Sequence, residues 1–138
     1  MTISVYLIDS GSATISGVRI RRAETEEDLR RLLKSPKIRK LRTKRDMVVI
    51  IGQDERHHAA TSVCFVDGAA IPVNGNLIIA GIDGDLLENA PAPLDIIAKR
   101  IELTRPMLDP VRRSSVSKAT DFTIRLVKQR PAVQSAME

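Results

Sequence analysis

The chain has almost no aromatic side chains from which to build a core. Its 138 residues include one Tyr, two Phe and no Trp, whereas it holds fifteen Ile. The core must therefore be aliphatic. The length fits one domain and leaves little room for a second.

Apolar patterning predicts several short strands and two helices. Residues 3–8 and 13–20 are expected to form a hairpin around the turn at 9–12. Further strands are expected at 47–51, 61–66, 76–82 and 121–128, with 69–73 short, bulged or at a sheet edge because Pro72 cannot donate to a ladder. Helices are predicted at 25–34, where Thr25 precedes a leucine stripe, and at 93–104. The fold class expected is α+β: a mostly antiparallel sheet with two short helices and a C-terminal arm.

The last third of the chain differs in composition from the rest. Residues 106–120 contain two Pro, four residues that are Ser or Thr and few large apolar side chains, which is typical of a linker. We therefore expect one α+β domain over residues 1–105, followed over 106–138 by a linker, a possible strand and a disordered tail from 131. Phe122, Ile124 and Leu126 alternate with polar residues, so this strand has one apolar face. Such a strand on a long arm predicts a homo-oligomer, most simply a twofold dimer.

Several classes of protein are excluded or disfavoured. No apolar run approaches the roughly 20 residues that span a bilayer, and the first residues lack the basic region of a signal peptide. A single Cys cannot form an internal disulfide or a cysteine metal cluster. We expect a cytoplasmic protein that has no membrane partner; if a phage encodes it, the compartment is the host cytoplasm.

Charge is segregated along the chain despite a net charge of only +5. Residues 30–45 hold nine basic and no acidic side chains, whereas residues 57–98 hold five acidic and no Lys or Arg. An exposed basic face would bind phosphate groups of nucleic acid or a nucleotide. Alternatively, the acidic middle neutralises the run, or an acidic protein binds it. The phosphate-binding candidates are Arg30, Arg31, Lys37, Arg39, Lys40, Arg42, Lys44 and Arg45.

Catalytic signals are weak. His57 and His58 are adjacent, so on a strand they point to opposite faces and rarely chelate one metal, although Asp54 or Glu55 would be available to help. Cys64 lies in a predicted strand and is expected to be a small buried hydrophobe. The segment at 81–85 is expected to be an Asp-Gly turn. No nucleotide-binding, zinc-protease or nucleophile-elbow motif occurs. We expect no cofactor and no metal, and an enzyme is the less favoured class.

A resemblance supplies a biological context. A strand at the start, a short leucine helix and a buried strand are followed by Asp67-Gly68, Pro72-x-Asn74 and Ile78-Ile79-Ala80-Gly81. Over about residues 3–103 this order resembles a small uncharacterised domain family of bacteriophages and plasmids. The chain departs from that pattern in lacking aromatic residues at 78–82 and in carrying the basic run. The resemblance implies an accessory protein of a mobile element and transfers no site residue.

Three functions follow as hypotheses. The first is a non-enzymatic binding protein that uses its basic face for nucleic acid or another phosphate-rich ligand. The second is an inhibitor or adaptor that grips a host protein, in the manner of a counter-defence protein. The third is an enzyme that uses His57 or His58. An exposed basic run favours the first function, a neutralised run the second, and a pocket joining the histidines to Cys64 the third.

Overall fold

The computed structural model describes residues 1–44, 46–53, 62–73, 75–111 and 121–134. These residues form strands and helices in the following order: β1 (Thr2–Asp9), β2 (Thr14–Arg21), a 3-10 turn (Arg22–Glu24), α1 (Thr25–Leu33), β3 (Ile38–Lys44), β4 (Met47–Gly52), β5 (Ser62–Val66), β6 (Ala69–Val73), β7 (Asn76–Asp83), β8 (Leu86–Glu88), α2 (Leu94–Lys99), β9 (Ile101–Val111), β10 (Asp121–Gln129) and β11 (Ala132–Gln134).

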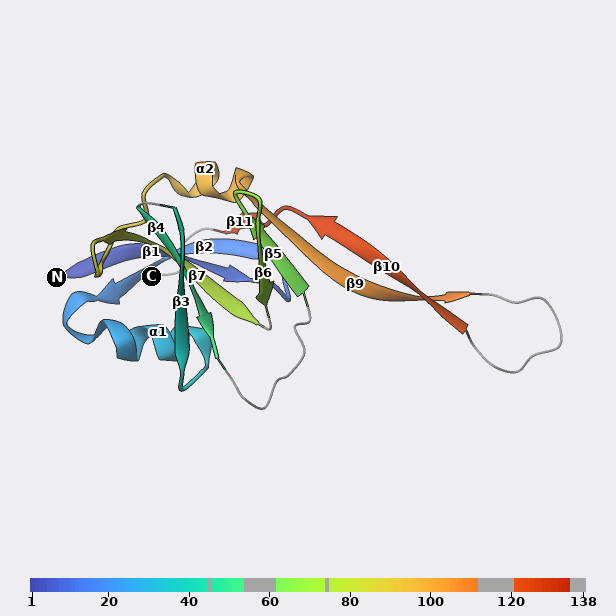
Figure 1. Ribbon diagram of the computed structural model, residues 1–138, viewed down its shortest axis with the longest axis horizontal. Helices are drawn as coiled ribbons and strands as arrows, with labels where there is room; N and C mark the ends of the chain where they lie inside the picture. The colour runs from blue at the N-terminus through green and yellow to red at the C-terminus, as the bar shows by residue number, and fades with distance from the viewer. Residues whose placement is uncertain (45, 54–61, 74, 112–120, 135–138) are drawn as a thin grey trace.

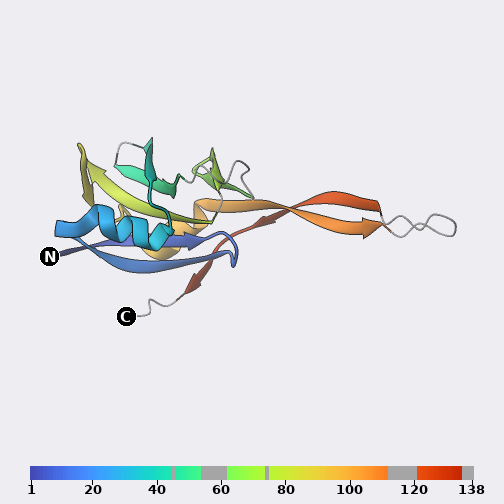
Figure 2. The same cartoon turned by 90° about the horizontal axis from the view of Figure 1, so that it is seen from below.

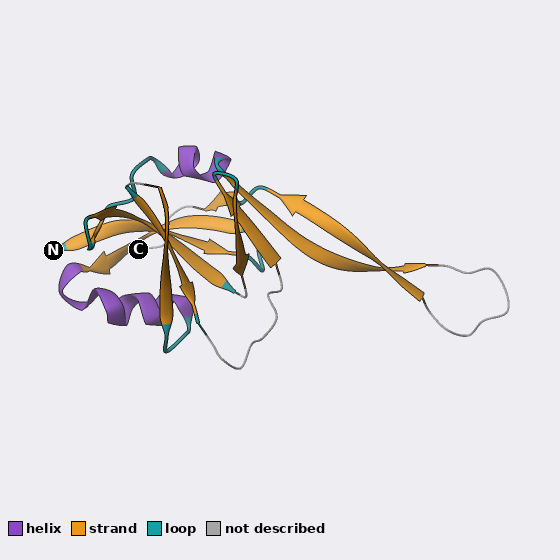
Figure 3. Ribbon diagram, in the orientation of Figure 1, coloured by secondary structure: helices purple, strands orange, loops and turns teal. Residues whose placement is uncertain are grey.

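The strands form two sheets (Figures 1 and 3). The larger has the order β11-β2-β1-β7-β4-β3, with β8 added beside the end of β7, and the smaller has the order β10-β9-β5-β6. All neighbours are antiparallel except β11, which runs parallel to β2. Helix α1 packs on one face of the larger sheet, and the smaller sheet and α2 pack on the other.

Strands β4 and β7 of the larger sheet are apolar at nearly every position because both of their faces are covered. In β4, Met47 and Val49 join the core shared with the smaller sheet, whereas Val48 and Ile50 join the core under α1. Strand β7 divides its residues in the same way between the two cores. A strand buried on both faces reads as a continuous hydrophobic run, and the short apolar runs of this sequence have that origin.

The α+β class predicted from the sequence is wrong: the protein is mostly β, with two sheets. In the described part, only α1 with its preceding 3-10 turn forms a helix of seven or more residues, and α2 has six. The spacing of Leu94, Ile97 and Ile101 predicts a helix to 104. Instead Ile101 and Leu103 enter the core from β9, which pairs with β5, so tertiary pairing outweighs the local helical spacing.

Residues 67–75 contain two dipeptides typical of tight hairpin turns, Asp67-Gly68 and Asn74-Gly75, and the tight turn was expected at the second, where Asn74 lies outside the described residues. Asp67 and Gly68 have φ of +50° and +85° and connect β5 to β6, as the Asp-Gly pair favours. Strand β6 is five residues long and lies at the edge of the smaller sheet, where Pro72 needs no ladder donor on its open side. The expectation of a short edge segment at 69–73 is confirmed.

The C-terminal part is more regular than its composition predicts. Strand β9 continues through Pro106 and Pro110 to Val111, where a linker was expected, and β10 forms where a strand was predicted. Residues 132–134, predicted to be disordered, form β11 beside β2. Strands β9 and β10 make a long two-stranded ribbon that projects from the body (Figure 2). The predicted domain boundary at 105 stays a prediction, and residues 112–120 and 135–138 lie outside the described part.

Candidate phosphate-binding surface

The basic segment occupies the second half of α1, the connection that follows, and the edge strand β3. Helix α1 ends at Leu33 and is capped by Lys34, whose left-handed backbone (φ 53°) lets its N–H donate to the carbonyls of Arg30 and Arg31. The chain then turns through Ser35, whose hydroxyl donates to the carbonyl of Lys37 at 2.7 Å. This compact turn brings the end of α1 next to the start of β3, so the cations of both elements lie along one margin of the body.

Strand alternation distributes the cations of β3 over two faces. Ile38 packs in the core under α1, and Lys40 pairs with Glu26 of that helix, so even positions face α1. Leu41 packs against the opposite core, so Arg39 lies on the other face. The basic run therefore does not form a single flat face. Because β3 is the last strand of its sheet, its side chains instead form a rim along the sheet edge, which we call the basic rim (residues 30–42).

Part of the basic rim is neutralised within the chain. Lys40 Nζ lies 2.8 Å from Glu26 Oε1, and Arg31 Nη2 lies 3.5 Å from Asp28 Oδ1. Arg42 donates from Nη2 to the carbonyl of Gly84 at 3.3 Å. Among the described residues, Arg30, Lys34 and Arg39 are exposed and make no side-chain ion pair. Lys40 and Arg31 are thus paired with carboxylates of α1, whereas Arg42 contacts a backbone carbonyl within residues 57–98.

The candidates differ in how well the structure places them. Arg30, Arg31, Lys37, Arg39, Lys40 and Arg42 are all exposed on this rim. Lys44 ends β3, but its side chain is not described, and Arg45 lies outside the described residues. Lys34, which was not among the residues predicted to bind phosphate, joins Arg30 and Arg39 because of its position at the end of α1.

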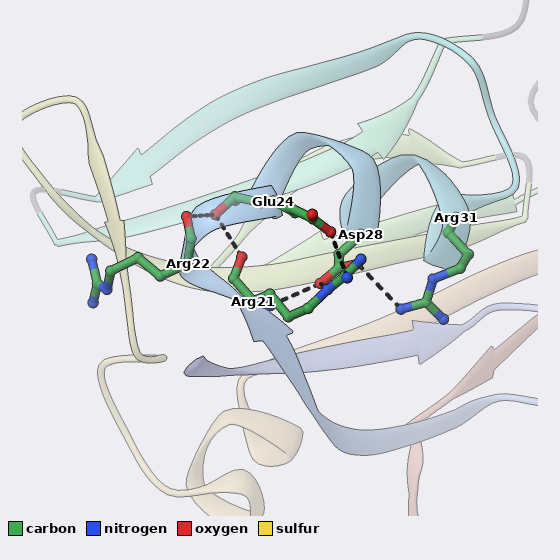
Figure 4. A network of polar contacts seen from close by, with 6 residues as sticks. Arg21, Arg22, Glu24, Asp28 and Arg31 are labelled. Atoms are coloured by element: carbon green, nitrogen blue, oxygen red, sulfur yellow. Dashed lines mark hydrogen bonds and ion pairs between the residues drawn. The ribbon is translucent and has the colours of Figure 1, made fainter. Parts of the chain in front are cut away.

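Asp28 anchors α1 against the end of β2 (Figure 4). Its side chain is only 2% exposed and accepts hydrogen bonds from the backbone N–H of Arg21 at 2.8 Å and from Nη2 of the same residue at 2.7 Å. These hydrogen bonds with the Arg21 guanidinium and backbone hold the pKa of the Asp28 carboxyl well below its usual range. The network fixes the helix that carries part of the basic rim.

We predict that Asp28→Asn lowers the free energy of unfolding by about 2 kcal/mol at neutral pH, because charge-assisted hydrogen bonds are lost. Since the folded pKa is depressed, the stabilisation is present above the unfolded value of about 3.9 and disappears as the pH falls through the lower folded value. Urea unfolding at pH 7 and at about pH 3 measures both effects: the difference between parent and variant shrinks in acid.

The matched control is Glu27→Gln, an exposed carboxylate on the same helix, which is expected to change stability by less than about 0.5 kcal/mol. Equal losses in the two variants would contradict the assigned role of Asp28.

The catalytic candidates gain no support from the described residues. His57, His58, Asp54 and Glu55 lie outside them. Cys64 is fully buried, as expected, and burial raises the pKa of its thiol to about 12, so it is not an activated nucleophile. The turn expected at 81–85 is confined to Gly84, with φ +62°, and Asp85, because residues 81–83 belong to β7. No cluster of three or more metal-ligating side chains occurs in the described part of the chain.

A second group of cations surrounds a shallow depression beside the base of the ribbon. Its lining includes Phe65, Gly68, Lys99, Arg100, Glu102 and Arg130. Arg100 Nε donates to Asp67 Oδ1 at 2.6 Å, which raises the pKa of that guanidinium. Arg130 donates from Nη1 to the carbonyl of Lys99 at 2.7 Å. Both arginines are bound to acceptors of the protein itself, so the depression is a weaker anion site than the basic rim.

Sequence reasoning did not anticipate the ribbon. The alternation of apolar and polar residues over 122–126 was visible in the sequence. The matching apolar positions of β9 were not recognised, because 106–111 resembled a linker. The signal that could have revealed it was the apolar residue at every second position of 106–110, namely Pro106, Leu108 and Pro110.

None of the helices in the described part is long and apolar enough to cross a membrane. Comparison with protein-family models, curated proteins and solved structures found no match. The resemblance to the phage and plasmid family therefore stays a prediction, and the geometry of this chain is what bears on its function.

Proposed function

We propose that this protein is a non-enzymatic binding protein whose basic rim contacts the phosphate backbone of a nucleic acid. The observation that supports this most is the set of three exposed cations, Arg30, Lys34 and Arg39, that have no ion-pair partner among the described residues. Exposed cations without an ion-pair partner carry counterions only, so phosphates replace solvent at little cost. Lys40 and Arg31 pair with carboxylates of α1, so they add less to the positive electrostatic potential of the rim than those three cations do.

The rim favours backbone contacts over recognition of bases. Strand β3 spans about 20 Å, which is the length of about six base-pair steps of a duplex. The described part of the rim contains no aromatic side chain, so it lacks the stacking platform of proteins that bind single strands. Binding is therefore expected to depend on charge and to be independent of sequence.

A salt titration tests this proposal. With three to five phosphate contacts, the logarithm of the binding constant for a short DNA duplex is expected to fall with the logarithm of salt concentration at a slope of about −2.7 to −4.5. Fluorescence anisotropy with a labelled duplex of mixed sequence measures it, and a second duplex of unrelated sequence is expected to bind equally. Absence of binding at about 50 mM salt would contradict the proposal.

The second candidate function, an adaptor or inhibitor that grips a host protein, is favoured by the projecting ribbon, which offers apolar residues far from the body. Capture of one host protein from a nuclease-treated lysate at high salt, lost when the apolar face of the ribbon is changed, supports this function. Capture that disappears with nuclease treatment supports the first.

A further inference from the structure

One face of the ribbon carries three successive apolar pairs, and the next pair toward the body on that face is Thr104 with Lys128. Residues directly opposite each other in an antiparallel pair share a face, and the register places Leu126 opposite Pro106, Ile124 opposite Leu108 and Phe122 opposite Pro110. The other face is mixed, with pairs such as Thr123 and Asp109 or Arg125 and Met107. Three successive apolar pairs therefore lie on one side of the ribbon, and we call these six positions the apolar face.

Among the described residues, no third strand pairs with the ribbon beyond Thr104. Strand β9 pairs with β5 only through Ile101–Thr104, and beyond that point its one strand partner is β10. At the base of the ribbon, where side chains are described, Pro106 is exposed and Leu126 is 64% exposed. Figures 1 and 2 show the ribbon, which continues the smaller sheet, leading away from β5, β6, the larger sheet and both helices.

An isolated two-stranded ribbon is at best marginally stable in water and needs a third strand or a packed apolar face. We propose that a second copy of this chain supplies that packing, and that the two apolar faces stack on each other across a twofold axis. The middle pair of the face, Leu108 and Ile124, then lies on the axis, because a twofold contact places the centre of one face on the centre of its mate.

The size of the face matches such a contact. Six apolar residues of ordinary size present on the order of 600 Å², so two copies bury about 1,200 Å² in total, which is the lower limit of standard stable interfaces. The face is also about 20 Å long, and two stacked layers of side chains fit the usual spacing of about 10 Å between sheets.

Charge favours this part of the molecule as the meeting point of two copies. The chain has a net charge of +5, and the exposed cations of the basic rim repel those of another copy. The ribbon residues 105–111 and 121–129 are nearly neutral, with three cations and two carboxylates: Arg105, Arg125, Lys128, Asp109 and Asp121. The three pairs of the apolar face include no charged residue, and the nearest described charge on that side is Lys128, one pair beyond Leu126, so stacking the three pairs buries no charge between the copies.

Sedimentation equilibrium of the full chain and of two lysine variants tests the proposal. Ile124→Lys places a charge on the apolar face, whereas Thr123→Lys adds the same charge to the adjacent residue on the opposite face. The full chain is expected to be a dimer at about 100 µM, Ile124→Lys to dissociate at least tenfold more readily, and Thr123→Lys to remain a dimer. A monomeric full chain, or equal behaviour of the two variants, overturns the proposal and leaves the face to a different partner.

Cross-linking decides the matter if Ile124→Lys fails to fold. Ile124→Cys is a mild change at the proposed axis, and a short bis-maleimide is expected to link two copies there, but not two copies of Thr123→Cys. Cys64 is fully buried and does not compete for the reagent. Linking of both variants, or of neither, contradicts a contact through the apolar face.

Discussion

Replacing Arg30, Lys34 and Arg39 together by serine is expected to weaken binding of a DNA duplex about a hundredfold at about 50 mM salt. These cations have no ion-pair partner among the described residues, so each replacement removes a phosphate contact and disrupts no internal pair. The salt slope should become shallower by about 0.9 for each phosphate that the variant no longer neutralises. Anisotropy titrations across a range of salt concentrations measure both quantities.

The matched control removes three exposed cations elsewhere and so lowers the net charge equally. Arg19, Lys99 and Lys128 lie on β2, at the end of α2 and on β10, away from the basic rim. Their joint replacement by serine is expected to weaken binding only a few-fold, through the smaller overall field. If both triple variants lose affinity to the same extent, binding depends on net charge and the rim is not the site.

Gly81→Ala is expected to lower the free energy of unfolding by about 3 kcal/mol, because the new methyl group overpacks a closed part of the fold. Gly81 lies in β7 between Met47 of β4 and Glu88 of β8, and a Cβ there would stand 2.1 Å from the carbonyl oxygen of Asn89.

The segment that would have to move is held on its other side. The Asn89 side chain accepts a hydrogen bond from the N–H of Ser4 at 2.8 Å, and the N–H of Ala90 donates to the carbonyl of Ser4 at 2.9 Å. These bonds fix the segment after β8 beside β1, so a shift that makes room for the methyl group also strains them.

Thermal and urea unfolding measure the loss at Gly81, which corresponds to a fall in melting temperature of about 10 °C for a chain of this size. The control is Gly17→Ala in β2, a strand glycine of the same sheet that has no positive φ and no atom within 4 Å of the place where its Cβ would stand. That variant is expected to change stability by less than about 0.5 kcal/mol. If Gly81→Ala lowers the free energy of unfolding no more than Gly17→Ala does, the close approach at Gly81 is relieved at little cost.

The candidate site was only partly predictable from the sequence. The uninterrupted basic run identified most of the exposed cations, since charges without local partners in the sequence tend to be solvated. Their arrangement was not predictable, because whether β3 is central or at an edge depends on which strands it pairs with, and β4 is its one sheet neighbour in the described part. The sequence also could not decide whether the acidic residues of 57–98 neutralise the basic run, because spacing along the chain does not show which carboxylates lie near the run in the fold. Glu26, which pairs with Lys40, lies before the run and reaches it through the fold, whereas Asp28 pairs with Arg31 within α1.

Neighbouring residues along the chain were enough to specify much of the local structure. The leucine stripe specified α1, and alternating and continuous apolar runs specified most strands. The cap expected from Thr25 does not form, because Glu24 is the N-cap residue and Thr25 is the first residue of the helix. Tertiary contacts selected the remainder, because the competing local conformations are close in energy and long-range pairing chooses between them. Pairing with β5 turns Ile101–Thr104 from expected helix into strand. Pairing with β10 turns Pro106–Val111 from an apparent linker into the ribbon that carries the apolar face.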